Sequence, residues 1–532
     1  MIAFPTLLVA AVVACVTAQN VTVQTTAGLL RGVSTTTING TAYYRFSGVP
    51  FAAPPVGELR FKPPQPVAQW EGVRDALEEA EDCLQAMGPQ MSGSEDCLYL
   101  NLYTPSLSEE ALLPVMVWIF GGHFWAGSSS AREYGPDFLL DQGVIVVALN
   151  YRLGVMGLLS LNDSIAMGNN AFKDMVAALQ WVQDNVRAFG GDPEKVTIFG
   201  QSAGGISCEM LMYSPLARGL FRAVISQSGS ALGGDHIVDT NREMAFCIGN
   251  ELGFQTEDAE ELLAFLQTAD AEALYQTSCG TEFQITAEPD VEGAFMTADH
   301  SRLGAWAIAG NFTHLPLLTG VTTGEGKLGV SEGYIPDSTL AELNSDFEGA
   351  IDNILRLGDM DEKLAVADAV RLFYFGNVTT ISADAAIPYS EMTTDLNNGE
   401  PCDTTVHILS TTMEQPVFYY QYAYTGRSDP SVVPGAPHMA DLDSLFSVPG
   451  SGQNLDPASD EQKVRSAMVK LWTNFAKYMN PTPDEDPVIE GGWPRFNEST
   501  AYYLNIDVNI TLEQNRNAER MNFVHSVIPP YY

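Results

Sequence analysis

The stretch FGGDPEKVTIFGQSAGGISC, residues 189–208, decides the fold that we expect for this chain. A β-branched run at 196–199 predicts a short strand, GQSAG follows at 200–204, and a helical pattern begins behind it. In this context the pattern G-x-S-x-G places its serine at the tip of a sharp turn. The two glycines lack a Cβ, so backbone can pass closely on both sides. The turn therefore presents the hydroxyl of Ser202 at a helix N-terminus, where free N–H groups favour developing negative charge.

Composition limits the classes of partner. The 532 residues include 45% hydrophobic and 10% aromatic side chains, which is enough for a substantial core. Acidic residues outnumber basic ones by 66 to 26, and the formal net charge is −40. Nucleic acids and anionic membranes are bound through clustered Lys and Arg, so this charge argues against both. We interpret the charge as a source of solubility outside the cell, and steering of cationic substrates is the alternative.

The N-terminus predicts secretion. Residues 1–18, MIAFPTLLVAAVVACVTA, form a short apolar run ending in small residues, as in a signal peptide cleaved near Ala18. An uncleaved anchor is the alternative, but the run is short for a membrane span. No other segment is as apolar, and the C-terminal HSVIPPYY is unlike a lipid-anchor signal. We therefore expect a secreted protein without stable membrane insertion, in which residues 19–532 form one domain.

Cysteines and glycosylation signals fit an oxidising compartment. Six cysteines remain after the leader, and we expect some of them to pair. Candidate glycosylation sequons stand at Asn20, Asn39, Asn162, Asn311, Asn377, Asn497 and Asn509. So many sequons behind a leader predict sugars at several of these positions.

Apolar runs recur along the chain at intervals that suit an α/β sheet. Near-continuous runs of this kind are typical of strands buried on both faces. They occupy residues 114–120, 144–150, 195–199, 222–227, 315–321 and 417–423. Helical patterns lie between them, most clearly at 171–189 and 460–480, and this alternation indicates a sheet covered by helices. The mostly helical, acidic segments 231–311 and 325–402 are predicted insertions over the carboxyl ends of the strands, where ligands bind in such folds.

Later loops contain a candidate base and a candidate acid for Ser202. A serine hydroxyl needs a base to take its proton, most often a histidine that a carboxylate orients. After an elbow serine, the expected chain order is acid and then histidine. Glu325 stands between glycines in TGVTTGEGKLG, and His438 stands in the Gly/Pro loop VVPGAPHMADLD. Each follows a predicted strand, although spacing alone leaves open that each is an ordinary loop residue.

A glycine-rich stretch supplies backbone donors near the serine. FGGHFWAG, residues 120–127, directly follows the apolar run 114–120. A tetrahedral oxyanion needs N–H groups aimed at it, and elbow hydrolases take them from such a loop and from the residue after the nucleophile. We assign the donors to Gly122, His123 and Ala203. The imidazole of His123 is not needed for this, because its donor is main chain.

Together these motifs resemble the type-B carboxylesterase/cholinesterase family of α/β-hydrolases. The most specific matches are FGGDPEKVTIFGQSAG at 189–204 and EDCLYLNLYTP at 95–105, and the resemblance spans residues 21–527. It implies an α/β-hydrolase fold with a large, mostly parallel central sheet flanked by helices, and with helical insertions over the active site. It implies hydrolysis of carboxylic esters through an acyl-enzyme intermediate, with a small-molecule ester as partner and no metal or organic cofactor.

The resemblance also assigns residues to roles. It implies a triad of Ser202 as nucleophile, Glu325 as acid and His438 as base. The oxyanion donors carry over to Gly122, His123 and Ala203, with histidine where many members have a third glycine. Ser228 in SQSGS matches a serine that often supports the triad.

The same resemblance suggests how the cysteines are used. It pairs Cys83 with Cys97, closing a loop too short for the flap of a lipase, so we expect an open gorge and soluble esters. Cys247 and Cys279 are candidates for a second pair, displaced from the usual position of the family. Cys208 is expected to be a buried free thiol, and Cys402 has no C-terminal partner.

Other members of the family provide the competing hypotheses. Cholinesterases have glutamate before the nucleophile and a tryptophan in the first disulfide loop, whereas this chain has Gln201 and no Trp between Cys83 and Cys97. Both differences argue against choline esters. Non-catalytic adhesion relatives lose the nucleophile, which is present here. A slow esterase that acts mainly by binding a ligand or a partner remains open, as do the natural ester, its acyl length and the oligomeric state.

Overall fold

The computed structural model describes residues 19–528, apart from short gaps at 88–89, 234–236, 239, 282, 356, 358–361, 427–431, 449–454 and 485–487. The expected leader, residues 1–18, therefore lies outside the described residues.

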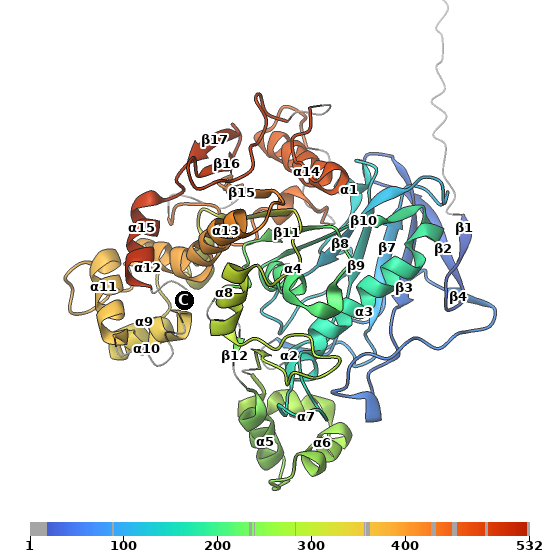
Figure 1. Ribbon diagram of the computed structural model, residues 1–532, viewed down its shortest axis with the longest axis horizontal. Helices are drawn as coiled ribbons and strands as arrows, with labels where there is room; N and C mark the ends of the chain where they lie inside the picture. Colours follow the sequence, from blue (N-terminus) through green and yellow to red (C-terminus); the bar gives the residue numbers. More distant parts are fainter. Residues whose placement is uncertain are drawn as a thin grey trace, which may run out of the picture.

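A large sheet forms the centre of the molecule (Figure 1). Among the described residues it has 13 strands, in the order β1-β2-β3-β7-β9-β8-β10-β11-β14-β15-β16-β17, with β4 beside β2. The central strands all run parallel, and they are β9 (Ile145–Leu149), β8 (Leu113–Ile119), β10 (Gly191–Gln201), β11 (Ala223–Gln227), β14 (Leu317–Thr322), β15 (Val417–Tyr422) and β16 (Tyr502–Ile506). Every residue of β9, β11, β14 and β15 is buried, as expected for strands covered on both faces.

Antiparallel strands extend the sheet at both ends. They are β1 (Asn20–Gln24), β2 (Leu29–Thr36), β3 (Ala42–Pro50) and β7 (Tyr99–Thr104) on one side, and β17 (Thr511–Gln514) on the other. β4 (Val73–Asp75) pairs with β2. Two small sheets pair β5 (Gln85–Met87) with β6 (Gln90–Ser92), and β12 (Ile237–Val238) with β13 (Ile285–Thr286).

Helices connect the strands along the chain and pack on the sheet. Those of the sheet region are α1 (Asp137–Leu140), α2 (Gly154–Leu158), α3 (Asn170–Asn185), α4 (Ala203–Tyr213) and α14 (Asp460–Tyr478), whereas α15 (Ala518–Val527) packs against the second insertion described below. In Figure 1, α3 lies across the strands. The expected strand 195–199 is longer in the structure, and the expected helix 171–189 continues beyond α3 as a 3₁₀ turn, Val186–Phe189.

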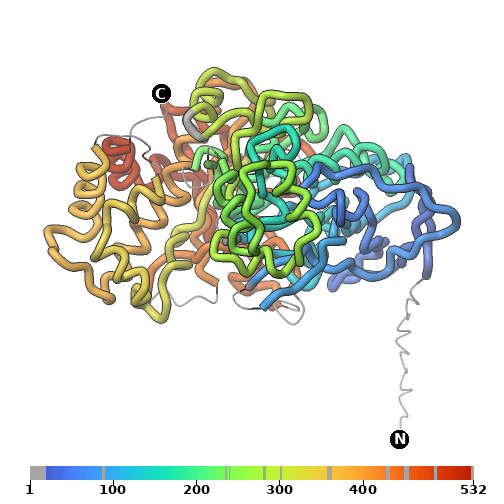
Figure 2. Tube along the Cα trace, turned by 90° about the horizontal axis from the view of Figure 1, so that it is seen from below, coloured from blue at the N-terminus to red at the C-terminus, as the bar shows by residue number. Residues whose placement is uncertain are grey.

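Two helical insertions follow the elbow, as the sequence predicts. The first contains α5 (Arg242–Glu251), α6 (Ala259–Thr268), α7 (Ala271–Gln276) and α8 (His300–Ala309). The second contains α9 (Asp337–Ser345), α10 (Phe347–Leu355), α11 (Lys363–Phe375), α12 (Ala386–Thr393), a π-helix η6 (Thr394–Gly399) and α13 (Glu400–Thr412). Figures 1 and 2 both show α9–α12 as a lobe at one end of the molecule, beside α15. This lobe has a hydrophobic cluster of its own, separate from the main core.

Buried ion pairs join the N-terminal half to the helices. Arg152 and Asp174 form two hydrogen bonds of 2.7 Å, Nε to Oδ2 and Nη2 to Oδ1, with both side chains buried. Arg60 binds Glu95 in the same bidentate way at 2.6 and 2.7 Å, and it also donates to the carbonyl of Leu266 in the first insertion. Separating the two partners of a buried pair would leave each charge buried without its counter-charge, which is costly. The pairs therefore fix the relative positions of the segments that they join.

The cysteines divide into two pairs and two free thiols. Disulfides join Cys83 to Cys97 and Cys247 to Cys279. Cys208 and Cys402 are free and fully buried. The first disulfide closes the loop that contains β5 and β6.

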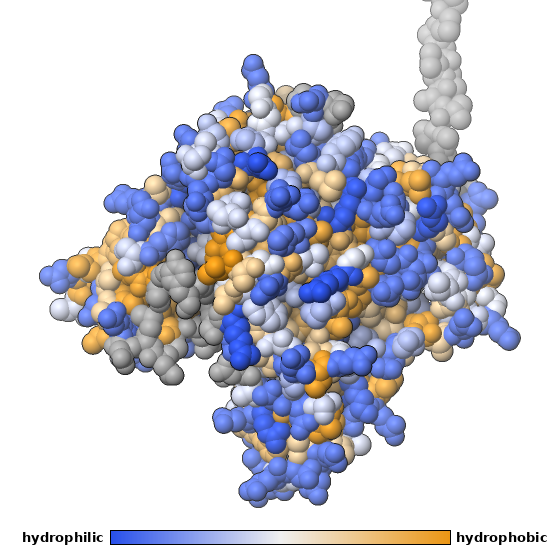
Figure 3. Space-filling view, viewed as in Figure 1, coloured by the Kyte–Doolittle hydropathy of each residue, from blue (hydrophilic) through white to orange (hydrophobic). Residues whose placement is uncertain are grey.

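The surface is mainly hydrophilic on the face shown in Figure 3, with smaller hydrophobic areas between the hydrophilic residues. The asparagines of all seven sequons are exposed. Among the described residues, no helix combines the length and the apolar character needed to cross a membrane.

Candidate active site

The elbow holds Ser202 in a strained backbone conformation. Ser202 directly follows β10 and precedes α4, with φ 57° and ψ −127°. Its N–H donates to the carbonyl of Gln227 on β11 at 2.8 Å, which ties the turn to the neighbouring strand. A Cβ at Gly204 would lie 2.0 Å from the carbonyl oxygen of Ile119, so only glycine fits there. The sheet thus supports a conformation that a serine in a free loop would rarely adopt.

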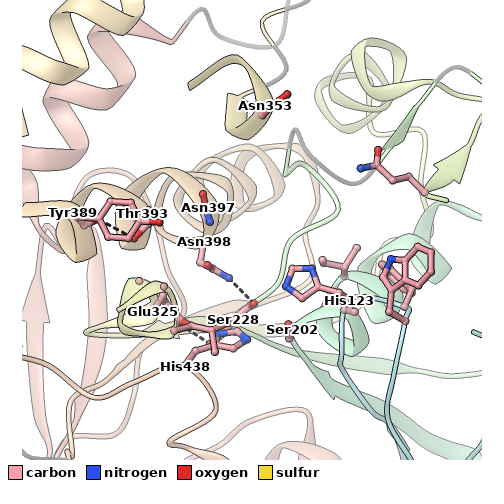
Figure 4. Close-up of a pocket in the computed structure, with 18 of the residues that line it drawn as sticks. His123, Ser202, Ser228, Glu325, Asn353, Tyr389, Thr393, Asn397, Asn398 and His438 are labelled. Atoms are coloured by element: carbon pink, nitrogen blue, oxygen red, sulfur yellow. Dashed lines mark hydrogen bonds and ion pairs between the residues drawn. The ribbon is translucent and has the colours of Figure 1, made fainter. Parts of the chain in front are cut away.

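Glu325 and His438 meet beside this turn. Glu325 begins a 3₁₀ turn (Glu325–Gly329) after β14, and His438 lies in the loop after β15. The carboxylate Oε2 is hydrogen-bonded to Nδ1 of the imidazole (Figure 4). The other oxygen, Oε1, accepts from the hydroxyl of Ser228 and from the N–H of Thr322, both at 2.6 Å. The carboxylate is therefore bonded on both oxygens, and its residue is only 3% exposed.

The charges of this pair shift both pKa values. Burial would raise the pKa of Glu325, but His438 and the donors Ser228 and Thr322 outweigh it, so the pKa lies below its ordinary value. Burial would lower the pKa of His438, but the charges of Glu325 and Asp441 outweigh it, so the pKa lies above its ordinary value. Each partner therefore favours the charged form of the other.

The second nitrogen of His438 contacts Gln201. Its Nε2 lies 3.0 Å from Nε2 of the Gln201 side chain, which is 1% exposed. With the Nδ1 proton directed at Glu325, Nε2 of a neutral imidazole is an acceptor, so the amide N–H of Gln201 donates to it. In this conformation the Ser202 hydroxyl makes no hydrogen bond to His438, although both side chains line the same cavity.

The glycine-rich loop after β8 places backbone N–H groups beside the serine. Gly122 has φ 114°, and a Cβ there would lie 2.0 Å from the carbonyl oxygen of Ala126, so the turn requires glycine. His123, at φ 56°, follows it and lines the cavity. Ala203 is the first residue of α4, where the N–H groups have no acceptor within the helix. In Figure 4, His123 lies on the opposite side of Ser202 from Glu325.

A cavity of about 450 Å³ opens above these groups. Its floor consists of Ser202, Ala203, Glu325 and His438, and both insertions contribute to its walls. The first insertion contributes Phe283 and Gln284, and the second contributes Asn353, Tyr389, Thr393, Asn397 and Asn398.

Comparison with known proteins shows which family has this arrangement. The profile of the carboxylesterase family matches residues 19–524. The chain belongs to the carboxylesterase family. It is 35% identical over 493 residues to a juvenile hormone esterase of Tribolium castaneum, covering 84% of this chain and 82% of that protein. It is 31% identical to a human cocaine esterase, covering 91% of this chain and 87% of that protein.

A solved structure agrees with these relatives. The crystal structure of juvenile hormone esterase from Manduca sexta, with OTFP covalently attached, superposes with a TM-score of 0.84 at 28% sequence identity. The match covers 96% of this chain and 99% of the other. This carboxylesterase therefore has the α/β-hydrolase fold and is a carboxylic ester hydrolase.

The loop that carries His438 is anchored by its own buried groups. Asp441 accepts from the amide of Gln227 at 2.7 Å and from the hydroxyl of Tyr420 at 3.2 Å. Burial raises the pKa of Asp441 to about 6, and the charge of Glu325 adds to this. Further along the loop, the ring of Phe446 packs 4.6 Å from that of Trp118 on β8. These contacts hold the histidine loop against the sheet of the carboxylesterase.

The structure brings most of the sequence-predicted site residues into one cavity, as Figure 4 shows. They are Ser202, Glu325, His438, His123, Ala203 and Ser228, with Gly122 next to them in the chain. Sequence reasoning missed three features: the contact between Gln201 and His438, the buried Asp441, and the asparagines of the second insertion. The sequence offered a signal for the first two, because Gln201 directly precedes Ser202 and Asp441 stands three residues after His438. The asparagines lie in an acidic helical stretch that matches no motif.

Proposed function

We propose that this carboxylesterase cleaves its ester with Ser202 as nucleophile, His438 as general base and Glu325 as the carboxylate that orients and charges the imidazole. One observation carries this proposal: three side chains far apart in sequence converge from the ends of β10, β14 and β15 on one cavity. The Manduca sexta relative with OTFP covalently attached supports a covalent route in this family. The N–H groups of Gly122, His123 and Ala203 serve as oxyanion donors in this scheme.

The first half of the reaction makes an acyl-enzyme. The oxygen of Ser202 forms a bond to the ester carbonyl carbon, its proton passes to Nε2 of His438, and the carbonyl electrons move to the oxyanion. When the tetrahedral intermediate collapses, the bond to the alcohol oxygen breaks and His438 returns the proton to that oxygen. In the second half, water attacks the acyl group, its proton passes to His438, and Ser202 leaves with that proton as the acid is released.

In the resting enzyme, the contact between Gln201 and His438 must be broken before the imidazole can act as a base. Nε2 of His438 is occupied by the amide of Gln201, so the imidazole must exchange this partner for the Ser202 hydroxyl before it can act. Catalytic hydrogen bonds are often long in free enzymes and tighten when substrate binds. We propose that Gln201 holds the imidazole with Nε2 unprotonated until substrate arrives.

The Ser202→Ala variant tests the proposal. With 4-nitrophenyl butyrate, kcat is expected to fall by roughly a thousandfold or more, because the nucleophile is lost while the oxyanion donors remain. Diethyl 4-nitrophenyl phosphate should attach one diethylphosphoryl group to the wild-type peptide that contains residue 202, as seen by mass spectrometry. Ser108→Ala, at an exposed serine outside the cavity and outside every sequon, is the control and should keep wild-type activity. Activity of Ser202→Ala within tenfold of wild type would remove Ser202 from the mechanism.

We further propose that the protein is secreted and glycosylated. The two disulfides and the exposed asparagines at all seven sequons support an oxidising, extracellular environment. A drop in mass after treatment of the secreted protein with an N-glycosidase tests this, and an unglycosylated protein that stays inside an expressing cell contradicts it.

A further inference from the structure

The cavity above Ser202 has two chemically different sides. Phe124, Trp125 and Phe283 contribute aromatic side chains. The second insertion contributes Asn353, Asn397, Asn398 and Tyr389, which we call the amide wall. In Figure 4, Tyr389, Asn397 and Asn398 lie on the side of Glu325, and Asn353 lies above them across the cavity, whereas His123 lies on the other side of Ser202.

The polar groups of the amide wall are largely unused within the protein. Among the described residues, the side chains of Asn353 and Asn397 and the hydroxyl of Tyr389 have no hydrogen-bond partner. Asn398 uses one N–H to donate to the carbonyl of Ser228 at 2.8 Å, which leaves its amide oxygen and its second N–H. Each amide offers two donors and one acceptor. Asn353 and Asn397 are exposed, so water satisfies their amides in the free enzyme. An apolar ligand would displace this water without replacing its hydrogen bonds, whereas a polar ligand replaces them.

The residues that line the cavity also indicate that the substrate group bound by the amide wall is neutral. Among the described residues that line the cavity, the ionisable side chains other than Tyr389 are His123 and the pair Glu325 and His438. Lys, Arg and Asp are absent from this set. A charged substituent would therefore enter without an opposite charge to pair with it. Amides instead suit hydroxyl and carbonyl groups, which donate and accept hydrogen bonds without carrying charge.

Two residues of the wall, Asn397 and Asn398, lie in the π-helix η6, which neighbouring groups hold in place. A π-helix inserts an extra residue into a helical turn and is frequent at functional sites. Here the hydroxyl of Thr394 accepts from the N–H of Gly326 at 2.9 Å, next to Glu325. Asp395, which is fully buried, accepts from the hydroxyl of Tyr374 at 2.8 Å. Arg516 donates to the carbonyl of Gly399 at 3.0 Å. Asn397 and Asn398 therefore stand on a backbone fixed on both sides, which favours selective binding.

We propose that the natural substrate is a neutral ester with hydroxyl or carbonyl groups close to the scissile bond, and that Asn397, Asn353 and Asn398 bind those groups. This rests on the proposed role of Ser202, because it fixes where the ester carbonyl lies. The amide wall acts through binding, and each hydrogen bond contributes roughly tenfold to selectivity for a hydroxylated ester over its deoxy analogue.

Two matched pairs of esters test this proposal. For the alcohol half, glycerol 1-monobutyrate is compared with propyl butyrate in a pH-stat, because the two differ only by two hydroxyls. For the acyl half, 4-nitrophenyl 3-hydroxybutyrate is compared with 4-nitrophenyl butyrate. Each ratio of kcat/KM is divided by the ratio of hydroxide-catalysed rates, which removes the difference in intrinsic reactivity. The wild type is expected to favour the hydroxylated ester about tenfold in at least one pair.

Variants then show whether the amide wall causes the preference. Asn397→Leu and, independently, Asn353→Leu are expected to reduce the ratio severalfold toward one. Asn250→Leu changes an exposed asparagine at the end of α5, outside the cavity, and should leave the ratio unchanged. A wild-type ratio within threefold of one in both pairs, or a preference that survives both variants, would overturn the inference. Loss of hydrolysis in Ser202→Ala is judged separately with 4-nitrophenyl butyrate, so failure of the triad and failure of the wall give different results.

Discussion

The cavity joins two regions that are held in place by different means. Its reacting end consists of turns at the carboxyl ends of β10, β14 and β15, where backbone geometry leaves little freedom. Ser202 is held at φ 57°, and Gly204 cannot accept a side chain. The amide wall instead stands on helices of the second insertion, which pack around their own hydrophobic cluster. If the triad and the amide wall act as proposed, reactivity and selectivity reside in parts that are built separately, so substitutions should affect one without the other.

Glu325→Gln should produce the largest effect and should act on the reacting end alone. Glutamine keeps the size of the side chain but cannot stabilise an imidazolium by charge. An amide N–H turned toward Ser228 and Thr322 would face two donors where a carboxylate oxygen accepts in the wild type. We expect kcat to fall by roughly 10²–10⁴-fold, while the selectivity between hydroxylated and deoxy esters persists in the residual activity. Glu348→Gln, at an exposed glutamate of α10, is the matched control. A loss of selectivity together with kcat would show that the two regions are coupled.

This division also explains what the sequence predicts well. The strands of the reacting end are short apolar runs. The rule that acid and histidine follow an elbow serine makes Glu325 and His438 candidates, and the resemblance to the carboxylesterase family assigns them to the triad. Because each of these motifs directly follows a strand of one parallel sheet, the fold brings them to the same edge of that sheet. The strand before the elbow is nevertheless longer than expected, because β10 begins at Gly191 instead of at residue 195. Its first residues lack a β-branched pattern; Gly191 pairs with Leu113 of β8, and after an irregularity the regular pairing resumes at Val196.

The amide wall has no comparable signal in the sequence. Helical periodicity in the segment 325–402 predicts helices, but it cannot show that residues 394–399 form a π-helix, since the extra residue shifts every later side chain. The partners that fix this shift, Tyr374 and Arg516, lie 21 and 117 residues from their contacts Asp395 and Gly399. Asparagines in an acidic helix are ordinary surface residues until tertiary structure places them in a cavity.

Gln201→Glu should change the pH dependence of the reacting end. The pKa of His438 already lies above 6.5, so wild-type kcat/KM should fall as the pH drops through that raised value and the base becomes protonated. A carboxylate at residue 201, in contact with Nε2, would stabilise the imidazolium and raise this pKa further. We expect the acid limb of the profile to move to higher pH by about one unit. The measurement is kcat/KM for 4-nitrophenyl butyrate between pH 5 and 9.

Gln276→Glu, at an exposed glutamine that ends α7, controls for the added charge. An acid limb that stays in place in Gln201→Glu would mean that residue 201 does not contact the imidazole in the working enzyme. Selectivity for hydroxylated esters should be the same in all three proteins, because residue 201 does not line the cavity.

Tyr374→Phe should produce the smallest effect of these substitutions, and it tests the amide wall. The Tyr374 hydroxyl donates to Asp395 at 2.8 Å, and Asp395 lies in the π-helix that carries Asn397 and Asn398. Removing this donor should lower the free energy of unfolding by about 1 kcal/mol, because a buried carboxylate loses a partner. Because Asp395 is two residues from Asn397, the preference for hydroxylated esters should weaken while kcat for 4-nitrophenyl butyrate changes little. Denaturant titration and the matched ester pairs measure the two effects.

Tyr334→Phe, at a tyrosine that is 58% exposed, should change neither. A Tyr374→Phe variant that loses stability but keeps full selectivity would show that the wall stays in place without this bond, held by the remaining contacts, which include the ion pair of 2.8 Å between Arg520 and Asp395.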